Sequence, residues 1–226
     1  MQDNILLEDA LLLVEQNFYF LHVGEFFAEL SKQEDFSTKE LSIKREFEDL
    51  KSYSFNPNII EEVLKDAFGK REITLFEYFV EFNSFRGICM AMVEALRLDS
   101  PFRDYMMTKL GDRYEDFFDI VSFVRNVLSH NIHADIRLNE KDFSGTLKRI
   151  RRMKRDTHIL FSFNYAIDLP EIGSPSLGYG FVCEIDFEKL KAGMPFLSVI
   201  SHWELMMLSE LCFNLVMAFR ATLFKR

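Results

Sequence analysis

Helical spacing of apolar side chains, at intervals of three and four residues, runs through most of this chain. Residues 5–31 and 73–97 carry it over the longest distances, which predicts two long helices. Gly87 in the second of these either weakens the helix by about 1 kcal/mol relative to Ala or allows another helix to approach closely. Shorter stretches with the same period predict further helices over residues 37–53, 59–68, 101–110, 112–134 and 198–226.

The period changes to two in the segment 156–185. Residues 158–165 and 180–185 alternate between apolar and polar side chains as strands do, and the Gly- and Pro-containing residues 170–178 between them are typical of a loop. We therefore predict a mainly α fold, a helical bundle with a small β-hairpin inserted near 158–185, built as a single domain over residues 1–226.

The composition is that of a folded protein with many large rings. Of the 226 residues, 48% are apolar and 25 are phenylalanine, so we expect a broad core or a covered partner surface. The net charge of -9 makes the whole chain a poor nucleic-acid binder. Three scattered cysteines, the lack of a signal-peptide pattern, and apolar runs interrupted by Glu15 and Glu210 predict a cytoplasmic protein without a membrane span.

The helix predicted over residues 112–134 divides most clearly into two faces. Its apolar arc contains Phe117, Ile120, Val121, Val124, Val127 and Leu128. Its opposite side carries Glu115, Asp119, Ser122, Asn126, Ser129, His130 and His133. Any amphipathic helix exposes polar residues opposite its apolar stripe, so this face indicates chemistry only if a more specific pattern is present.

That pattern is the string Arg125-Asn126-Val127-Leu128-Ser129-His130. Its R-x4-H spacing, with a polar residue directly after the Arg, resembles the signature of the HEPN superfamily. The resemblance covers these six residues closely and the helical frame loosely. It implies a HEPN-like helical bundle that acts as a metal-independent ribonuclease, as in toxin–antitoxin and defence systems, with Arg125, Asn126 and His130 as catalytic residues.

The resemblance also implies partners. Catalytic HEPN proteins place two copies of the motif face to face, which implies a homodimer with a composite active site, RNA as the substrate, and an antitoxin or other regulatory protein. Ser129 and His133 are accessory candidates, and no metal or other cofactor is implied. Ile132 stands where one branch of the family carries a Tyr that is adenylylated, so that form of control is not predicted. The alternative function is a non-catalytic HEPN-like domain that binds RNA or a protein partner.

The three residue types suit cleavage of RNA by its own 2′-oxygen. Histidine can act as base or acid at cellular pH, and arginine offers a permanently charged fork to phosphate oxygens. On a straight helix, Arg125 and His130 point about 140° apart. They converge only if the helix ends near His130, if the Arg side chain wraps round, or if a second subunit completes the site.

A basic segment begins eighteen residues after His130. Its six cations within eight residues are Lys148, Arg149, Arg151, Arg152, Lys154 and Arg155. Residues 137–156 carry a net charge of +5, and a basic island in an acidic chain is typical of a contact with a nucleic-acid backbone. We expect these side chains to bind RNA; the alternative is a solvated surface that balances the acidic charge of the same protein.

Overall fold

In the computed structural model, residues 2–33, 35–40, 44–46, 52–66, 74–131, 135–170 and 180–223 are described. Residues 1–18 together with 84–226 form one compact unit, and residues 19–83 form a second. The prediction of a single domain over 1–226 stays a prediction.

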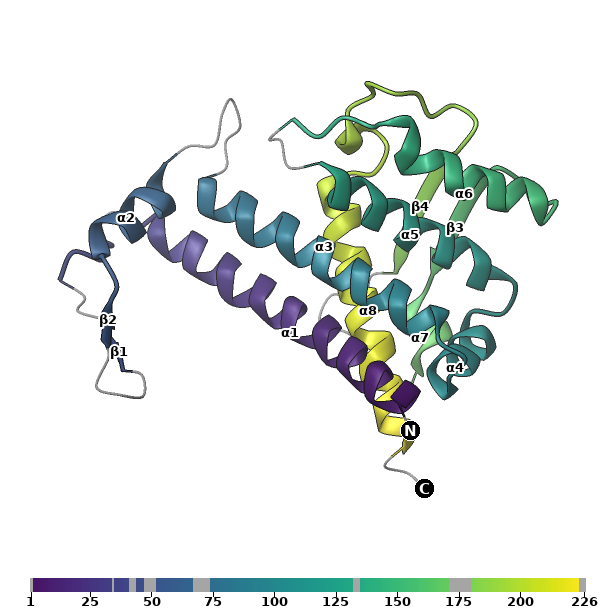
Figure 1. The fold of residues 1–226 in the computed structure, drawn as a ribbon, viewed down its shortest axis with the longest axis horizontal. Helices are drawn as coiled ribbons and strands as arrows, with labels where there is room; N and C mark the ends of the chain where they lie inside the picture. The colour runs from purple at the N-terminus through teal and green to yellow at the C-terminus, as the bar shows by residue number, and fades with distance from the viewer. Residues whose placement is uncertain are drawn as a thin grey trace. The chain divides into compact units, whose positions relative to one another are not determined.

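The larger unit is mainly helical (Figure 1). Its elements, counting the two long helices that continue into the smaller unit, are α1 (Gln2–Ser31), α3 (Leu75–Arg97), α4 (Pro101–Leu110), α5 (Tyr114–His130), α6 (Glu140–Arg152), β3 (His158–Phe163), α7 (Tyr165–Asp168), β4 (Phe181–Asp186) and α8 (His202–Leu223). Short 3-10 turns cover Gly111–Arg113 and Phe196–Ser198. The predicted mainly α fold and the β-hairpin near 158–185 are confirmed.

Helix α5 occupies the core of this unit. It packs against both α6 and β3, while α8 packs against β4. All six residues of its predicted apolar arc are completely buried. The ring of Phe117 lies 5.7 Å from that of Phe161 on β3, and the ring of Phe123 lies 5.5 Å from that of Phe187 just after β4. The apolar stripe thus fixes which side of α5 is left for polar residues.

The hairpin has the alternating burial that its sequence predicts. Strands β3 and β4 are antiparallel, and Phe163 pairs with Phe181 at the end of the ladder. A Cβ atom on the preceding Gly180 would lie 2.1 Å from the carbonyl oxygen of Phe163, so glycine lets the strands close here. Strand β3 ends earlier than predicted because the side chain of Asn164 accepts a hydrogen bond from the Ala166 N–H and starts α7.

Helix α5 also ends earlier than predicted, at His130 instead of Ala134. The Arg86 side chain donates hydrogen bonds to the carbonyl oxygens of Leu128 and Asn131, at 2.6 and 3.5 Å. Asn131 is extended, with φ -119° and ψ 121°. An arginine from α3 therefore satisfies carbonyl groups that the end of the helix leaves without an intrahelical partner.

Helix α8 is long and apolar enough to cross a membrane by length and composition alone. However, 56% of its most apolar stretch is buried inside the structure, with Leu211, Cys212 and Leu215 completely covered. A core helix has this burial, so α8 gives only weak evidence for a membrane span.

The smaller unit departs from the sequence prediction. Its strands β1 (Lys44–Glu46) and β2 (Ser52–Ser54) pair antiparallel, and α2 runs over Pro57–Lys65. The helix predicted over 37–53 is therefore wrong in the part that is described. Side-chain hydrogen bonds take the place of the predicted helix cap. The Ser37 hydroxyl accepts a hydrogen bond from the Lys39 N–H, and the Thr38 hydroxyl donates one to the carbonyl oxygen of Pro57.

Candidate functional site

The three predicted catalytic side chains lie in the last two turns of α5, outside its apolar arc. His130 is the final residue of the helix and its side chain is 37% exposed. Arg125 and Asn126 are half-buried, and Ser129 is exposed beside His130. His133 lies outside the described residues. The helix end places the imidazole where solvent and a ligand can reach it.

A buried carboxylate orients His130. The Nδ1 atom of His130 lies 2.9 Å from Oδ1 of Asp142, which is completely buried. The Asn139 backbone N–H and the Asn131 side-chain amide donate to the other carboxylate oxygen, at 2.7 and 3.3 Å. Because an ionised carboxylate only accepts hydrogen bonds, this contact favours the neutral tautomer that has its proton on Nδ1 and its lone pair on Nε2. No described residue occupies Nε2.

Asn126 connects the arginine to this pair. Its side-chain oxygen accepts from the Arg125 guanidinium at 3.0 Å, and its side-chain nitrogen donates to the Asp142 carbonyl oxygen at 3.4 Å. Among the described residues, no hydrogen bond joins Arg125 to His130 directly. Arg125 points instead toward α3, where its guanidinium lies 3.9 Å from the Glu94 carboxylate. The motif residues thus form one chain of contacts through Asn126 and Asp142.

Asp142 does not belong to the set of catalytic residues that was predicted from the sequence. Its signal is the spacing Asn139-x-x-Asp142, a polar residue followed three positions later by an acid, which marks the start of a helix. The Asp142 side chain accepts from the Asn139 N–H in this way. Its second role, at His130, depends on the packing of α6 against α5, and no local pattern predicts that packing.

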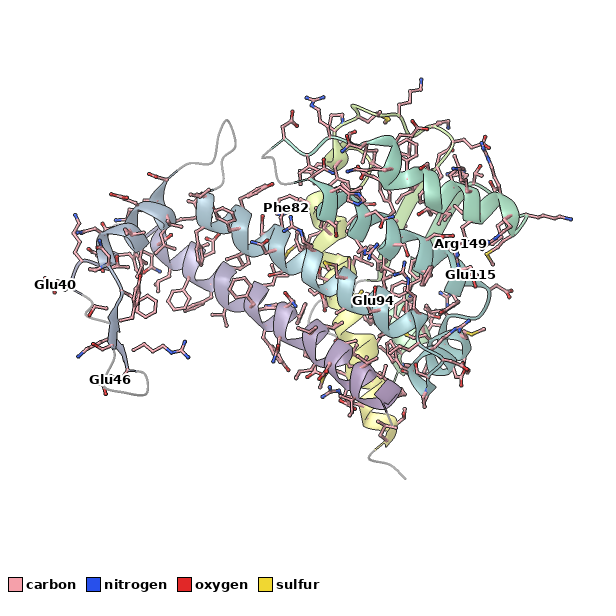
Figure 2. All side chains as sticks on the ribbon, viewed as in Figure 1. Glu40, Glu46, Phe82, Glu94, Glu115 and Arg149 are labelled. Carbon is pink, nitrogen blue, oxygen red and sulfur yellow. The ribbon has the colours of Figure 1, made fainter. Side chains whose placement is uncertain are left out.

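The basic segment divides into two sets. Arg149 forms ion pairs with Glu115 and Asp119, and Arg155 forms ion pairs with Asp116 and Asp119 (Figure 2 shows Glu115 and Arg149). The Asp119 carboxylate is almost completely covered by these contacts. Burial raises the pKa of Asp119, while the two guanidinium groups act in the opposite direction. Two of the six predicted RNA contacts are therefore engaged within the chain.

The other set faces solvent. Arg151 forms an exposed ion pair with Glu188 at 3.2 Å. Lys148, Arg152 and Lys154 are exposed and have no charged partner within the described parts of the chain. A hollow of about 210 Å³ is lined by Gly145, Lys148, Arg149 and Arg152. The hypothesis of a backbone contact with RNA now rests on Lys148, Arg151, Arg152 and Lys154.

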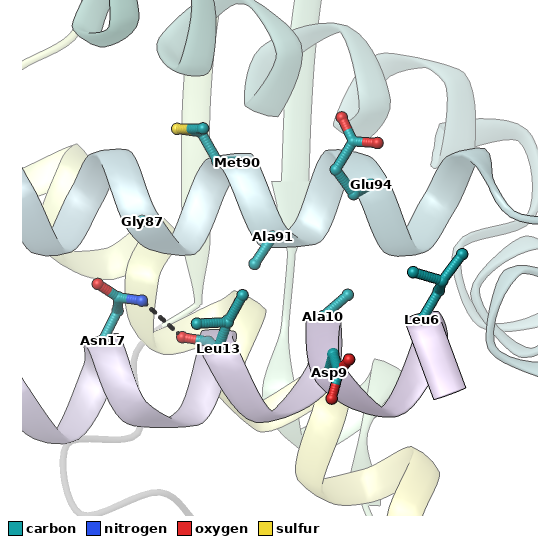
Figure 3. A pocket seen from close by; sticks show the side chains of 9 residues that line it. All are labelled: Leu6, Asp9, Ala10, Leu13, Asn17, Gly87, Met90, Ala91 and Glu94. Atoms are coloured by element: carbon teal, nitrogen blue, oxygen red, sulfur yellow. Dashed lines mark hydrogen bonds between the residues drawn. The ribbon is translucent and has the colours of Figure 1, made fainter. Parts of the chain in front are cut away.

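An apolar groove forms a second surface of the larger unit (Figure 3). It has a volume of about 350 Å³ between α1 and α3 and is lined by Leu6, Asp9, Ala10, Leu13, Asn17, Gly87, Met90, Ala91 and Glu94. A Cβ atom on Gly87 would lie 2.1 Å from the side-chain oxygen of Asn17. The predicted close helix approach at Gly87 is thus confirmed, and it forms one end of the groove.

The cysteines and acidic residues point to no additional centre. Cys89, Cys183 and Cys212 are buried free thiols, and burial raises the pKa of Cys89 and of Cys183 to about 12. Within the described ranges, no three His, Cys, Asp or Glu side chains are grouped so that they could hold a metal ion. Comparison of the chain with protein families, curated proteins and solved structures gave no match.

Proposed function

We propose that this protein is a metal-independent endoribonuclease of the HEPN-like type. One observation carries the proposal: a buried carboxylate holds Nδ1 of His130, and no described residue contacts Nε2 at this exposed helix end. This is the arrangement that a general base needs, because the second ring nitrogen fixes both the tautomer and the orientation of the first. The resemblance of the Arg125–His130 string to the HEPN motif, which includes His130, supports the same function.

In the proposed reaction the 2′-oxygen of a ribose attacks the adjacent phosphorus atom. The O2′–P bond forms and the P–O5′ bond breaks, which gives a 2′,3′-cyclic phosphate and a 5′-hydroxyl. His130 Nε2 takes the proton of the 2′-hydroxyl, and Arg125 stabilises the charge on the phosphorane oxygens. A second histidine protonates the departing 5′-oxygen, which a two-fold homodimer supplies as His130 of the other copy.

The test is cleavage of mixed RNA in excess EDTA by three proteins: wild type, His130→Ala and His158→Ala. His158 is the control because it is also an exposed histidine paired with a carboxylate, Glu184. We expect wild type and His158→Ala to cleave, and His130→Ala to be slower by a factor of about 10³. Equal cleavage by His130→Ala and wild type would remove the enzyme assignment.

The composite site makes a second measurement informative. Sedimentation at micromolar concentration should give the mass of a dimer, twice the 26.7 kDa of one chain. Adding an excess of inactive His130→Ala to wild type should then lower the activity of the wild type, because a heterodimer lacks one of the two histidines that the reaction uses. A purely monomeric protein with full activity would contradict the shared site.

A second candidate function is the binding of a protein partner, and the apolar groove favours it. The groove is lined by the exposed apolar side chains of Leu6, Leu13 and Met90. The acidic residues Asp9 and Glu94 also line it. Residues 1–31 contain six acidic residues and no Lys or Arg. The occupant that complements this surface is an amphipathic helix with an apolar face and basic flanks.

Two synthetic helical peptides with the same apolar face test this function. We expect the peptide with Lys flanks to bind in an anisotropy titration and the peptide with Glu flanks not to bind. The Leu13→Asp variant should lose the binding, since it places a charge in the groove. Equal binding of both peptides to wild type and to Leu13→Asp would exclude the groove as the site.

A further inference from the structure

A small cavity lies at the opposite end of α5 from the motif. It has a volume of about 190 Å³ and is lined by Leu96, Arg97, Arg103, Tyr114, Glu115, Phe118 and Arg149. The lining comes from four elements: the end of α3, the start of α4, the first turns of α5, and α6. Three arginines and one glutamate give the cavity a positive lining, which attracts anions.

Two of these three arginines, Arg97 and Arg103, supply the positive charge that can bind an anion. Arg149 is matched by Glu115 and Asp119. Within the described part of the chain, the ion-pair partner of Arg97 is the exposed Glu94, three residues earlier on the same helix, at 3.1 Å. A pair of exposed charges of this kind is weak and exchanges readily for a stronger anion.

The second available arginine is Arg103, which is half-buried. It contacts the hydroxyl of Tyr114. Burial raises the pKa of Tyr114, so this contact brings no negative charge to Arg103.

The cavity and Arg125 share one face of α5. Phe118 and Arg125 are seven residues apart, so they lie on the same side of the helix about 10 Å apart along its axis. Glu94 joins them on α3, since its carboxylate is 3.1 Å from Arg97 and 3.9 Å from Arg125. This separation is short enough for a single RNA strand of a few nucleotides to reach from Arg125 to the cavity.

We propose that Arg97 and Arg103 bind a backbone phosphate of the RNA a few nucleotides from the phosphate that is cleaved. The ring of Phe118, which has the Arg149 guanidinium 4.6 Å from its centre, forms the apolar wall beside that phosphate. This inference rests on the proposed ribonuclease function, and it adds a subsite that the R-x4-H motif and the basic segment 148–155 do not contain.

The test separates binding from cleavage by using His130→Ala as the background. In this background we compare Arg97→Gln/Arg103→Gln with Lys189→Gln/Lys191→Gln, which removes the same charge from exposed lysines of another segment. Labelled RNA of twelve nucleotides and of two nucleotides is titrated at several salt concentrations. Because one phosphate contact on a single strand contributes about 0.7 to the log–log salt slope, the arginine variant should lose about that much with the long RNA.

The short RNA should bind both variants equally, because it is too short to reach from the motif to the cavity. An arginine variant that matches the lysine control with the long RNA would overturn the subsite, as would an equal loss with both lengths. Arg97→Glu, at the more exposed position, repeats the measurement if the double variant does not fold. Failure of wild type to cleave RNA would count against the ribonuclease function, whereas cleavage with no effect of these arginines would count against the subsite alone.

Discussion

The two ends of helix α5 each carry polar side chains that meet α6, and they differ in what they leave free. At the N-terminal end, Glu115, Asp116 and Asp119 are matched by Arg149 and Arg155. At the C-terminal end, Asp142 matches one nitrogen of His130, and the other nitrogen stays accessible. We call the first the closed cluster and the second the open cluster.

The difference shows how similar residue types serve different purposes. In the closed cluster every charge has a partner, so an added ligand would have to break ion pairs that hold α5 against α6. In the open cluster, the buried Asp142 carboxylate fixes the orientation of the imidazole through Nδ1, and no described residue contacts Nε2. A free functional atom that is held rigidly, and not the presence of charged residues, therefore distinguishes a candidate site from a structural contact.

The largest effect is expected from breaking the closed cluster. Asp119→Ala leaves two partly buried guanidinium groups without their shared carboxylate, and should reduce the free energy of unfolding by about 3 kcal/mol. Urea unfolding measures this, with Glu188→Ala as the control because its pair with Arg151 is exposed. The control should change stability by less than about 0.5 kcal/mol. Equal losses in the two variants would contradict the distinction between the clusters.

Removing the orienting carboxylate of the open cluster should affect chemistry more than stability. In Asp142→Asn the amide cannot hold the imidazole as the carboxylate does, so kcat for RNA should fall about 100-fold while KM changes little. Asp135→Asn, which alters an exposed pair with Arg137, is the control and should keep its kcat. A rise in KM with unchanged kcat would show that Asp142 acts in binding and not in positioning His130.

The ion pair between Arg113, directly before α5, and Asp168 predicts how the stability of the fold depends on pH. Two hydrogen bonds from Arg113, at 2.7 and 2.9 Å, hold the pKa of Asp168 below its ordinary value. Because the folded pKa is lowered, the pair stabilises the fold above the unfolded value of about 3.9 and loses its contribution as the pH falls through the folded value.

The variant Asp168→Asn lacks this contribution. At neutral pH it should be less stable than wild type by about 1 to 2 kcal/mol. The difference should shrink in urea unfolding series taken from pH 6 towards pH 2. A constant difference across that series would show that the ionisation of Asp168 is not what stabilises the start of the helix.

The smallest effect is expected at the solvent-facing part of the basic segment. Changing Lys148, Arg152 and Lys154 to Gln should reduce the log–log salt slope of RNA binding by up to about 2, at about 0.7 per phosphate contact. Cleavage at saturating RNA should be unchanged, because His130 and Arg125 are intact. The control replaces Arg137, Lys189 and Lys191 by Gln, and a slope equal to that of the control would return the segment to a solvated surface.

Periodicity along the chain determined most of the fold. The regular spacing of apolar residues located α1, α3, α5 and the last helix, and the alternation from residue 158 located the hairpin. These predictions succeeded because a repeated apolar face must be buried, whatever covers it. The polar segment 37–53 lacks such a constraint, and in its described part Ser37 and Thr38 form hydrogen bonds with Lys39 and Pro57 where a helix was predicted.

For the candidate site, the sequence by itself placed Arg125, Asn126 and His130 near the end of one helix, outside its apolar arc. Only the tertiary structure brought Asp142 to His130, ended α5 at His130 through Arg86, and assigned Arg149 and Arg155 to the acids of α5. Each of these decisions joins residues that lie twelve or more positions apart. The charge of a side chain can be read from the sequence, but its partner is set by how the chain folds back, which depends on packing between elements.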